Sequence, residues 1–451
     1  MVLRESPFPN RPLAALDALA QGLLCPGFWA LNQLLDLQPT TAPRARGRGC
    51  CGCTGRALGG LACAALLLLS LPLTALGLLL WLPVQAARRP FAYHHHATTT
   101  APVSWDLRQR RGFTFVSANL CLLPSGLAKF SNLGQTLERA AFAAQQLVPE
   151  PPGAHDSLIP RPRGEAGPWH YGSVVVDMEG AAGERAVAKL LPADASRRFP
   201  AELSERFPAH ADFLCLQEVY DAGAAARLRQ RLAKSFPYIV YDVGARGLQG
   251  CGLKLFGSGL FLASRYPLLA VQYHCYPNGA REDALSAKGL LSVQVTAAPS
   301  PGTPLPLLPP PLPGGERGWA PCDEPNQSHE IFKLYRDPCR VGPKQDEPWA
   351  MGRTRLLPVT PCAHPLVPPN PPGPGGRRQF LAGPILSSGQ LDPEAGDAWQ
   401  GRRIDYVLYR PRHDNQPLRE EVESFSFITQ MASRSDHLPV ALRLAVSPTA
   451  P

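Results

Sequence analysis

The feature that most constrains this chain is an unbroken apolar stretch, residues 57–87, which contains no charged side chain. About 20 apolar residues in a helix cross the hydrocarbon core of a bilayer, so the stretch is long enough to span it. Pro72 lies near its middle and Pro83 near its end, so a kinked or re-entrant hairpin competes with a straight span. The stretch begins too far from Met1, and is too long, for a cleavable signal peptide. We therefore predict a membrane anchor.

A second apolar segment, residues 12–37, precedes this stretch. It carries Asp17 and contains Pro26, which predicts an interfacial or re-entrant piece rather than a straight span. Arginines lie on both sides of the later stretch, so charge sets no orientation, and the arrangement fits a hairpin that returns to the same membrane face. Together the two segments predict that residues 1–90 form the anchor.

The connection between the two segments combines positive charge with closely spaced cysteines. Arginines beside an anchor suit anionic lipid headgroups, and cysteines at this position are where reversible acylation usually occurs. Arg88 and Arg89 add positive charge on the far side of the later stretch. The connecting arginines are Arg44, Arg46 and Arg48, and the candidate acylation sites are Cys50, Cys51 and Cys53.

The net charge of +9 on 451 residues favours a polyanionic partner, either nucleic acid or anionic lipid, and is also compatible with no such partner. The 12 cysteines show neither the spacing of metal ligands nor a disulfide framework. A reduced, cytosol-facing domain is therefore the simpler expectation.

Beyond the anchor, strand-like segments mix with a few helical ones, which predicts an α+β or α/β sandwich. Residues 91–111 are expected to form a polar linker, and residues 112–446 one domain. Three stretches, 149–205, 296–322 and 358–400, are expected to interrupt it as irregular insertions. The prolines of the second insertion exclude it from a central strand, because proline removes a ladder donor.

Polar side chains recur where the apolar strand-like runs end. Carboxylate and amide oxygens there suit a hard divalent cation, and a nearby imidazole can accept the proton of an attacking water. Adjacent Asp and His residues can serve one site only at a strand end or in a loop. Each residue alone is weak evidence, because such side chains are common on surfaces. The candidates are Asn119, Glu218, Asp405, Asp436 and His437.

Seven motifs in order resemble the neutral sphingomyelinases of the Mg²⁺-dependent exonuclease–endonuclease–phosphatase superfamily, which is DNase I-like. The motifs are SANLCLLP, FLCLQEVYD, SGLFLASRYP, YHCYPN, DALSAKG, RRIDY and FSFITQ with SDHLPVAL. The N-terminal MVLRESPFPN and the apolar anchor match the membrane-attached branch of that family. The resemblance covers most of 1–142, 206–295, 327–352 and 400–446. It implies a four-layer α/β sandwich with an N-terminal membrane anchor.

The resemblance also implies an activity, which is Mg²⁺-dependent hydrolysis of sphingomyelin to ceramide and phosphocholine at a membrane surface, with Mn²⁺ as a substitute. It implies residence at the mitochondrial inner membrane, the endoplasmic reticulum membrane or both. Anionic phospholipids are expected partners, and nucleic acid is not. In the family, a pair matched here by Asp283 and Lys288 switches the site between closed and substrate-ready forms.

The resemblance assigns the remaining roles position by position. Glu218 matches the Mg²⁺ ligand, and Asn119 matches an active-site amide that supports metal and phosphate. His437 matches the general base, and Asp405 matches the carboxylate that orients it. Asp436 matches a residue that contacts the metal-bound water or the phosphate.

The chain departs from the family after KGLLSVQV. The family continues with a Thr-His-Leu-His segment and a Gly-Asp-x-Asn segment in a central strand, whereas residues 296–322 are proline-rich here. Asp323 and Asn326 have the wrong spacing to replace that pair, so these central strands lack a counterpart. Losing one preorganised donor typically costs about 10²–10³ in rate. An active membrane-anchored sphingomyelinase and an inactive membrane-anchored relative both stay open. A nuclease of the same superfamily is disfavoured by the anchor and by YHCYPN and DALSAKG.

Overall fold

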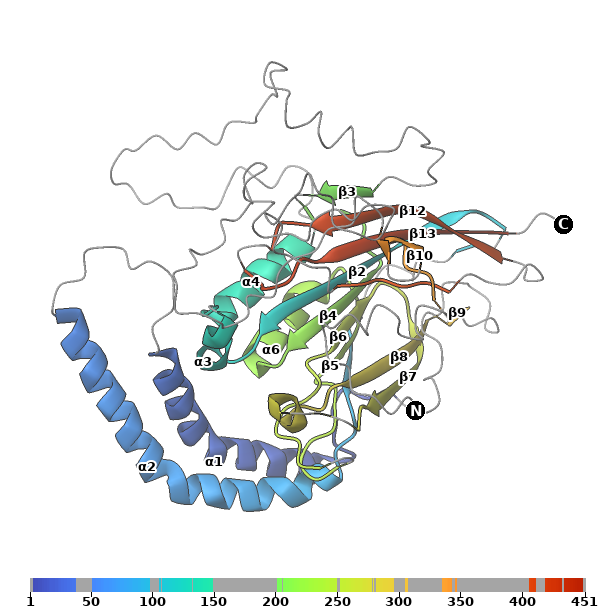
Figure 1. Cartoon of the computed structure of the whole chain (residues 1–451). Helices are drawn as coiled ribbons and strands as arrows, with labels where there is room; N and C mark the ends of the chain where they lie inside the picture. The colour runs from blue at the N-terminus through green and yellow to red at the C-terminus, as the bar shows by residue number, and fades with distance from the viewer. Residues whose placement is uncertain are drawn as a thin grey trace.

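A computed structural model gives the fold of the chain (Figure 1). It describes a pair of long helices, a large mixed sheet, a smaller sheet and the helices that cover the large sheet. The described residues are 3–37, 51–97, 105–106, 108–131, 133–148, 201–204, 206–249, 252–277, 279, 281–295, 305–306, 335–342, 345–346, 405–410, 418–431 and 434–448.

Eight strands form the main sheet in the order β1-β5-β6-β4-β2-β13-β12-β3. Central strand β2 pairs parallel with β4 and antiparallel with β13. Because β2 and β4 are parallel, their carboxyl ends meet at one edge, with Asn119 opposite Gln217. The strands are β1 (Ala92–His95), β2 (Arg111–Leu122), β3 (Ala201–Ser204), β4 (Phe213–Val219), β5 (Tyr238–Tyr241), β6 (Phe261–Ser264), β12 (Leu418–Ile428) and β13 (Val440–Pro448).

A smaller sheet packs on one face of the main sheet through an aromatic core. Phe113 of β2 and Phe213 of β4 share this core with Val271 of β7 and Val293 of β8. Large rings here give much apolar area per side chain, which favours the packing of the two sheets. The smaller sheet contains β7 (Leu268–Cys275), β8 (Gly289–Val295) and β9 (Leu305–Pro306), and a separate pair is β10 (Arg340–Gly342) with β11 (Gln345–Asp346).

Helices cover the opposite face of the main sheet. Alanines and leucines of α4 (Thr136–Leu147) and α6 (Ala222–Leu232) pack on β2 and β4. The side chain of Asp221 caps α6 by accepting a hydrogen bond from the Ala224 N–H. Short α3 (Ser125–Ala128) and the 3₁₀ segments Lys129–Ser131 and Arg281–Leu285 lie near the carboxyl ends of the strands. The α/β class is confirmed, and the described residues contain three of the expected four layers.

The predicted anchor is a pair of helices, α1 (Arg11–Asp36) and α2 (Cys51–Ala86), which lie side by side (Figure 1). Both are long and apolar enough to cross a membrane. At Gly27 the helices approach closely, because an added Cβ there would lie 2.5 Å from Thr74 Oγ1. A small residue at such a crossing is typical of packed membrane helices.

The prolines in these helices do not end them. Pro26 lies inside α1, so the predicted interfacial piece is one continuous helix. Pro72 and Pro83 both lie inside α2, which excludes a re-entrant hairpin within residues 57–87. Membrane helices tolerate internal proline because neighbouring groups satisfy the freed backbone carbonyls.

The predicted linker, residues 91–111, is in fact part of the domain. Strand β1 pairs antiparallel with β5 at the edge of the main sheet. Trp105 is buried and packs edge-on against Phe113, so its ring completes the aromatic core. The expectation of a polar linker was wrong because these apolar side chains are few and widely spaced.

Two of the predicted insertions contribute short strands. Strand β3, in 149–205, pairs parallel with β12, and β9, in 296–322, pairs with β8. Each lies at the edge of its sheet, where a strand such as β9 can contain Pro306. The third insertion, 358–400, lies outside the described residues.

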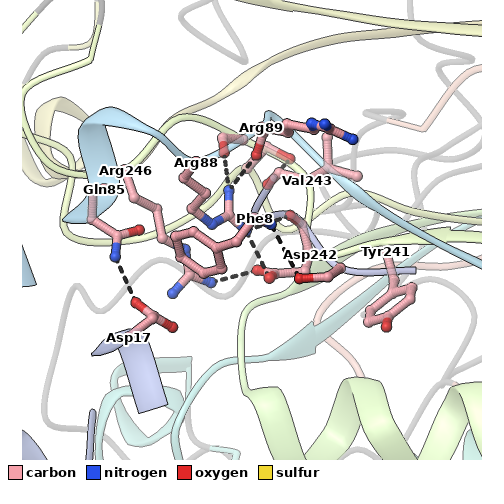
Figure 2. A network of polar contacts seen from close by, with 12 residues as sticks. Phe8, Asp17, Gln85, Arg88, Arg89, Tyr241, Asp242, Val243 and Arg246 are labelled. Atoms are coloured by element: carbon pink, nitrogen blue, oxygen red, sulfur yellow. Dashed lines mark hydrogen bonds and ion pairs between the residues drawn. The ribbon is translucent and has the colours of Figure 1, made fainter. Parts of the chain in front are cut away.

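A polar network fastens the end of α2 to the domain (Figure 2). Arg88 Nη2 lies 2.6 Å from Asp242 Oδ2, and Arg246 Nη2 lies 2.6 Å from Asp242 Oδ1. Burial raises the pKa of Asp242, but the charges of Arg246 and Arg88 outweigh it and hold that pKa below its ordinary value. Arg88, one of the two arginines that flank the later apolar stretch, is therefore held by the domain.

The anchor contacts the domain at other points as well. Gln249 Nε2 donates hydrogen bonds to the carbonyls of Gln85 and Ala86, which are among the last of α2. At the other end of the pair, Asn32 Oδ1 accepts a hydrogen bond from the Gly126 N–H. Helix α1 thus touches α3, while the end of α2 touches the loop after β5.

Asp242→Asn is expected to lower the free energy of unfolding by about 3 kcal/mol, because it leaves the buried Arg88 guanidinium without its charge partner. Removing one partner of a fully buried ion pair usually costs about 3–5 kcal/mol. The lower end of this range applies here because the Asp242 side chain is 31% exposed. Chemical denaturation in detergent micelles measures this, with the exposed Asp106→Asn as the matched control. A loss equal to that of the control would contradict a stabilising role for the pair.

Candidate active site

The predicted base and its orienting carboxylate meet at the carboxyl edge of the main sheet. His437 Nδ1 lies 3.0 Å from both Asp405 Oδ1 and Asp405 Oδ2, and both side chains are 13% exposed. His437 stands in the turn before β13, where its N–H donates to Ser435 Oγ. A proton on Nδ1, shared with Asp405, makes Nε2 the nitrogen that can accept another proton.

The segment that carries Asp405 is fixed against the sheet. Arg336 and Tyr409 exchange two backbone hydrogen bonds, of 2.7 and 3.0 Å. Val407 and Tyr409 pack on a cluster that includes Phe425 of β12 and Val440 of β13. Asp405 and His437, which are 32 residues apart, are thereby brought into contact by one packed layer.

The ionisation of His437 is set by opposing effects. Burial lowers the pKa of the imidazole, but the charge and hydrogen bond of Asp405 outweigh it, and Asp436 and Glu218 raise it further. The resulting pKa is about 9. The electrostatic influence of three carboxylates on one imidazole indicates that the predicted residues form one cluster.

This pKa predicts a pH-dependent contribution to stability. Because the folded-state value of about 9 exceeds the ordinary 6.5, the Asp405 pair stabilises the fold fully below about pH 6.5. The contribution, roughly 3 kcal/mol, is lost as pH rises through about 9. Denaturation in the presence of chelator should therefore find the gap between unmutated protein and Asp405→Asn largest near pH 6 and small near pH 10. A gap that stays constant across this range would contradict the coupling.

The segment that carries Asn119 and the segment that carries Asp436 lie side by side. Asn119 is 7% exposed, and its Oδ1 accepts a hydrogen bond from the Cys121 N–H. Ser435 Oγ donates to the Asn119 carbonyl at 2.7 Å, which ties β2 to the turn that holds Asp436. Asp436 is 4% exposed, and its buried Oδ1 has no hydrogen-bond partner among the described residues.

Glu218 occupies the end of β4 in a strained backbone conformation. Its φ of 58° lies in the left-handed region, which is uncommon for a residue other than glycine. Gly259 makes this possible, because a Cβ at Gly259 would lie 3.0 Å from Glu218 Cα. Strain of this kind costs about 1–3 kcal/mol and clusters at functional sites. It therefore favours a specific role for the Glu218 side chain.

Two carboxylates of the site, Asp436 and Glu218, are of the ligand type that a hard divalent cation takes. Carboxylate oxygens are the ligands that Mg²⁺ prefers, and the unpartnered buried Asp436 Oδ1 needs a positively charged or hydrogen-bonding partner. The charges of Asp436 and Glu218 both raise the pKa of Cys121, which burial already raises, so both carboxylates lie near one point. No set of three or more His, Cys, Asp or Glu residues with metal-binding geometry occurs in the described part of the chain.

The predicted gating pair is in contact. Lys288 Nζ lies 2.8 Å from Asp283 Oδ1, with the two side chains about equally exposed. Tyr220 OH lies 3.1 Å from Ser286 Oγ and so connects this segment to the end of β4. The pair therefore borders the site that contains Glu218.

The candidate acylation sites are only partly described. Cys50 lies outside the described residues, as do the side chains of Cys51 and Cys53, whose backbone forms the first turn of α2. Ser435 and Tyr220, which link the segments of the site, were not among the residues predicted from the sequence. Both stand within motifs of the family resemblance, so their position beside Asp436 and Glu218 was the available signal.

Comparisons with known proteins agree on one family. Residues 12–87 match the model described as the neutral sphingomyelinase N-terminal transmembrane region. Sphingomyelin phosphodiesterase 5 of Danio rerio is 33% identical over 99% of this chain and 99% of its own length. The protein of that name from Mus musculus is 34% identical over 98% of this chain and 94% of its own length. Sphingomyelin phosphodiesterase 3 of Homo sapiens is 30% identical over 99% of both chains.

Solved structures give a weaker likeness. Sphingomyelinase C from Streptomyces griseocarneus has 15% identity and a TM-score of 0.32, covering 75% of this chain and 99% of that one. A beta toxin mutant from Staphylococcus aureus with bound magnesium ions has 12% identity and a TM-score of 0.34, covering 75% and 100%. The family assignment depends on the sequence relatives, which match this chain over nearly its whole length. The chain belongs to the neutral sphingomyelinase family.

Proposed function

We propose that this chain hydrolyses sphingomyelin to ceramide and phosphocholine at a membrane surface, with Mg²⁺, or Mn²⁺ in its place, as cofactor. The observation that carries the proposal is the contact of His437 Nδ1 with both oxygens of Asp405, at 3.0 Å. This contact prepares an imidazole to take a proton from water. The relatives named sphingomyelin phosphodiesterases support the choice of substrate.

Each residue has a proposed role. His437 Nε2 accepts the proton of the water that attacks phosphorus, and Asp405 holds the ring in the tautomer that leaves this nitrogen unprotonated. Glu218 is the proposed ligand of Mg²⁺, with Asp436 beside it, and Asn119 helps to position the phosphate. When bound, the cation supplies positive charge that stabilises the charge growing on the phosphate.

The proposal extends to regulation and location. The Asp283–Lys288 ion pair, half-exposed at the border of the site, is the proposed switch between closed and substrate-ready forms. Anionic phospholipids are the proposed surface partners of the arginines before α2. We propose the mitochondrial inner membrane, the endoplasmic reticulum membrane or both as the compartment.

One assay tests the proposal directly. The purified full-length chain is placed in vesicles of phosphatidylcholine, phosphatidylserine and labelled sphingomyelin, with Mg²⁺ or with chelator. Release of phosphocholine in Mg²⁺ alone is the expected result. Absence of release would favour the alternative, an inactive membrane-anchored relative that lacks the Thr-His-Leu-His and Gly-Asp-x-Asn segments. Grafting those segments in place of 296–322 should then restore activity.

A further inference from the structure

A buried arginine outside the proposed catalytic set donates hydrogen bonds to segments that carry site residues. Arg139, in the first turn of α4, is 3% exposed. A guanidinium has five N–H donors in a fixed planar fork. All five donate here, and every acceptor is an uncharged oxygen. The acceptors are the carbonyls of Gly134 (2.8 Å), Leu120 (3.0 Å), Arg434 (3.0 Å) and Cys121 (2.8 Å), and Thr136 Oγ1 (3.4 Å).

Three of these five acceptors belong to the two segments that carry site residues. Leu120 and Cys121 directly follow Asn119 at the end of β2. Arg434 lies two residues before Asp436. One nitrogen, Arg139 Nη1, donates to both the Leu120 and the Arg434 carbonyls, so the two segments share a single donor group.

The local backbone explains why these carbonyls need a donor. The register between β2 and β4 shifts between Asn119 and Leu122, and Cys121 has a positive φ of 48°. A shift of this kind interrupts the ladder and leaves backbone groups unpaired. Buried carbonyls without a partner destabilise a fold, so Arg139 replaces the missing ladder bonds. Ser435 Oγ adds a parallel contact to the Asn119 carbonyl.

The position of Arg139 is also electrostatically significant. Burial lowers the pKa of the guanidinium, while the nearby Cys121 and Asp436 side chains raise it. Its fixed positive charge therefore lies within electrostatic reach of the Asp436 side chain.

We propose that Arg139 is a positioning residue: together with Ser435, it clamps the end of β2 to the 434–437 turn and so sets Asn119 relative to Asp436 and His437. A displacement of about 1 Å in such a site can reduce the rate about 10²-fold. The kinetic part of this inference rests on the proposed function, whereas the structural part does not.

The test compares Arg139→Lys with the unmutated full-length chain in micelles. Lysine keeps the charge but cannot reach several carbonyls at once. The expected result is a kcat about 10²-fold lower with KM unchanged. Peptide-resolved hydrogen exchange should also become faster in 119–123 and 434–438 while the other strands stay protected. Arg265→Lys is the matched control, because Arg265 lies over the Phe236 ring away from these segments.

Other results would overturn the inference. Exchange that rises across the whole main sheet, or a kcat loss equal to that of Arg265→Lys, would reduce Arg139 to a general stabiliser of the fold. If both kcat and hydrogen exchange are unchanged in Arg139→Lys, the inference is wrong. If Arg139→Lys does not fold, Ser435→Ala tests the inference by the same measurements, kcat and hydrogen exchange in 119–123 and 434–438. The expected changes are smaller. If the unmutated chain has no turnover, the proposed function fails, while the exchange comparison still decides whether the clamp exists.

Discussion

His437→Ala is expected to reduce sphingomyelin hydrolysis by about 10²–10⁴-fold, the usual contribution of a positioned general base. Membrane association should not change, because His437 lies in the turn before β13 and the helices of the anchor are intact. Phosphocholine release and vesicle flotation measure the two properties. Asp405→Asn should lower kcat with little effect on KM, because the defect lies in the orientation of the base.

The control for this substitution is His274→Ala, because His274 is an exposed histidine on β7. Its activity should equal that of the unmutated chain. Turnover that survives His437→Ala at the unmutated rate would eliminate this residue as the base.

The pH profile provides a second readout for His437. The base must be neutral to accept a proton, so activity should rise with pH through its pKa. The pKa of about 9 is higher than the ordinary 6.5 that the sequence alone suggests, because the charges of Asp405, Asp436 and Glu218 all favour the protonated ring. A cation bound near Glu218 disfavours the imidazolium. Raising the Mg²⁺ concentration should therefore move the rising limb to lower pH, between these two values.

Glu218→Gln should abolish activation by Mg²⁺ at ordinary concentrations, because a neutral amide is a poor substitute for a carboxylate ligand. A fall of about 10² or more in rate, partly recovered at high Mg²⁺, is the expected result. Mg²⁺ titrations of phosphocholine release measure it. Glu138→Gln, at an exposed position in the first turn of α4, is the matched control.

Glu218→Gly separates catalysis from stability. Glycine adopts the left-handed φ of 58° without the penalty of a Cβ, so the free energy of unfolding should not fall and should rise by up to about 1 kcal/mol. Activity should nevertheless be lost with the carboxylate. A clear loss of stability in this variant would contradict strain at Glu218.

The candidate site could be predicted where the chemistry of a residue is visible in its type. His437 and Asp405 carry groups that few structural roles require, and each stands in a motif. Arg139 was missed because arginine on a helix usually marks the solvent face. The available signal was its spacing: Thr136 and Ala143, three residues before and four residues after Arg139, lie on the buried side of α4.

The fold was predictable where patterns are regular. A sandwich of mixed α and β elements follows from strand-like and helical runs, but the conformations of Cys121 and Glu218 do not. Both residues have a positive φ although neither is glycine. Residue type therefore does not predict this conformation, which depends on the packing around each residue. The apolar spacing over residues 126–148 is typical of one amphipathic helix, whereas α3 and α4 are separate, with Gln135 at a φ of 51° before α4. Tertiary contacts overrode helical periodicity there.

The short join between anchor and domain has a kinetic consequence. Five residues, 87–91, separate the end of α2 at Ala86 from the start of β1 at Ala92. Even fully extended, a connecting segment of this length reaches only about 20 Å. The domain therefore cannot leave the bilayer between turnovers, and its search for substrate is two-dimensional. We expect the rate to follow the mole fraction of sphingomyelin within the surface. Diluting it with inert phosphatidylcholine at constant total lipid should slow the enzyme, whereas adding more vesicles of the same composition should not change its rate.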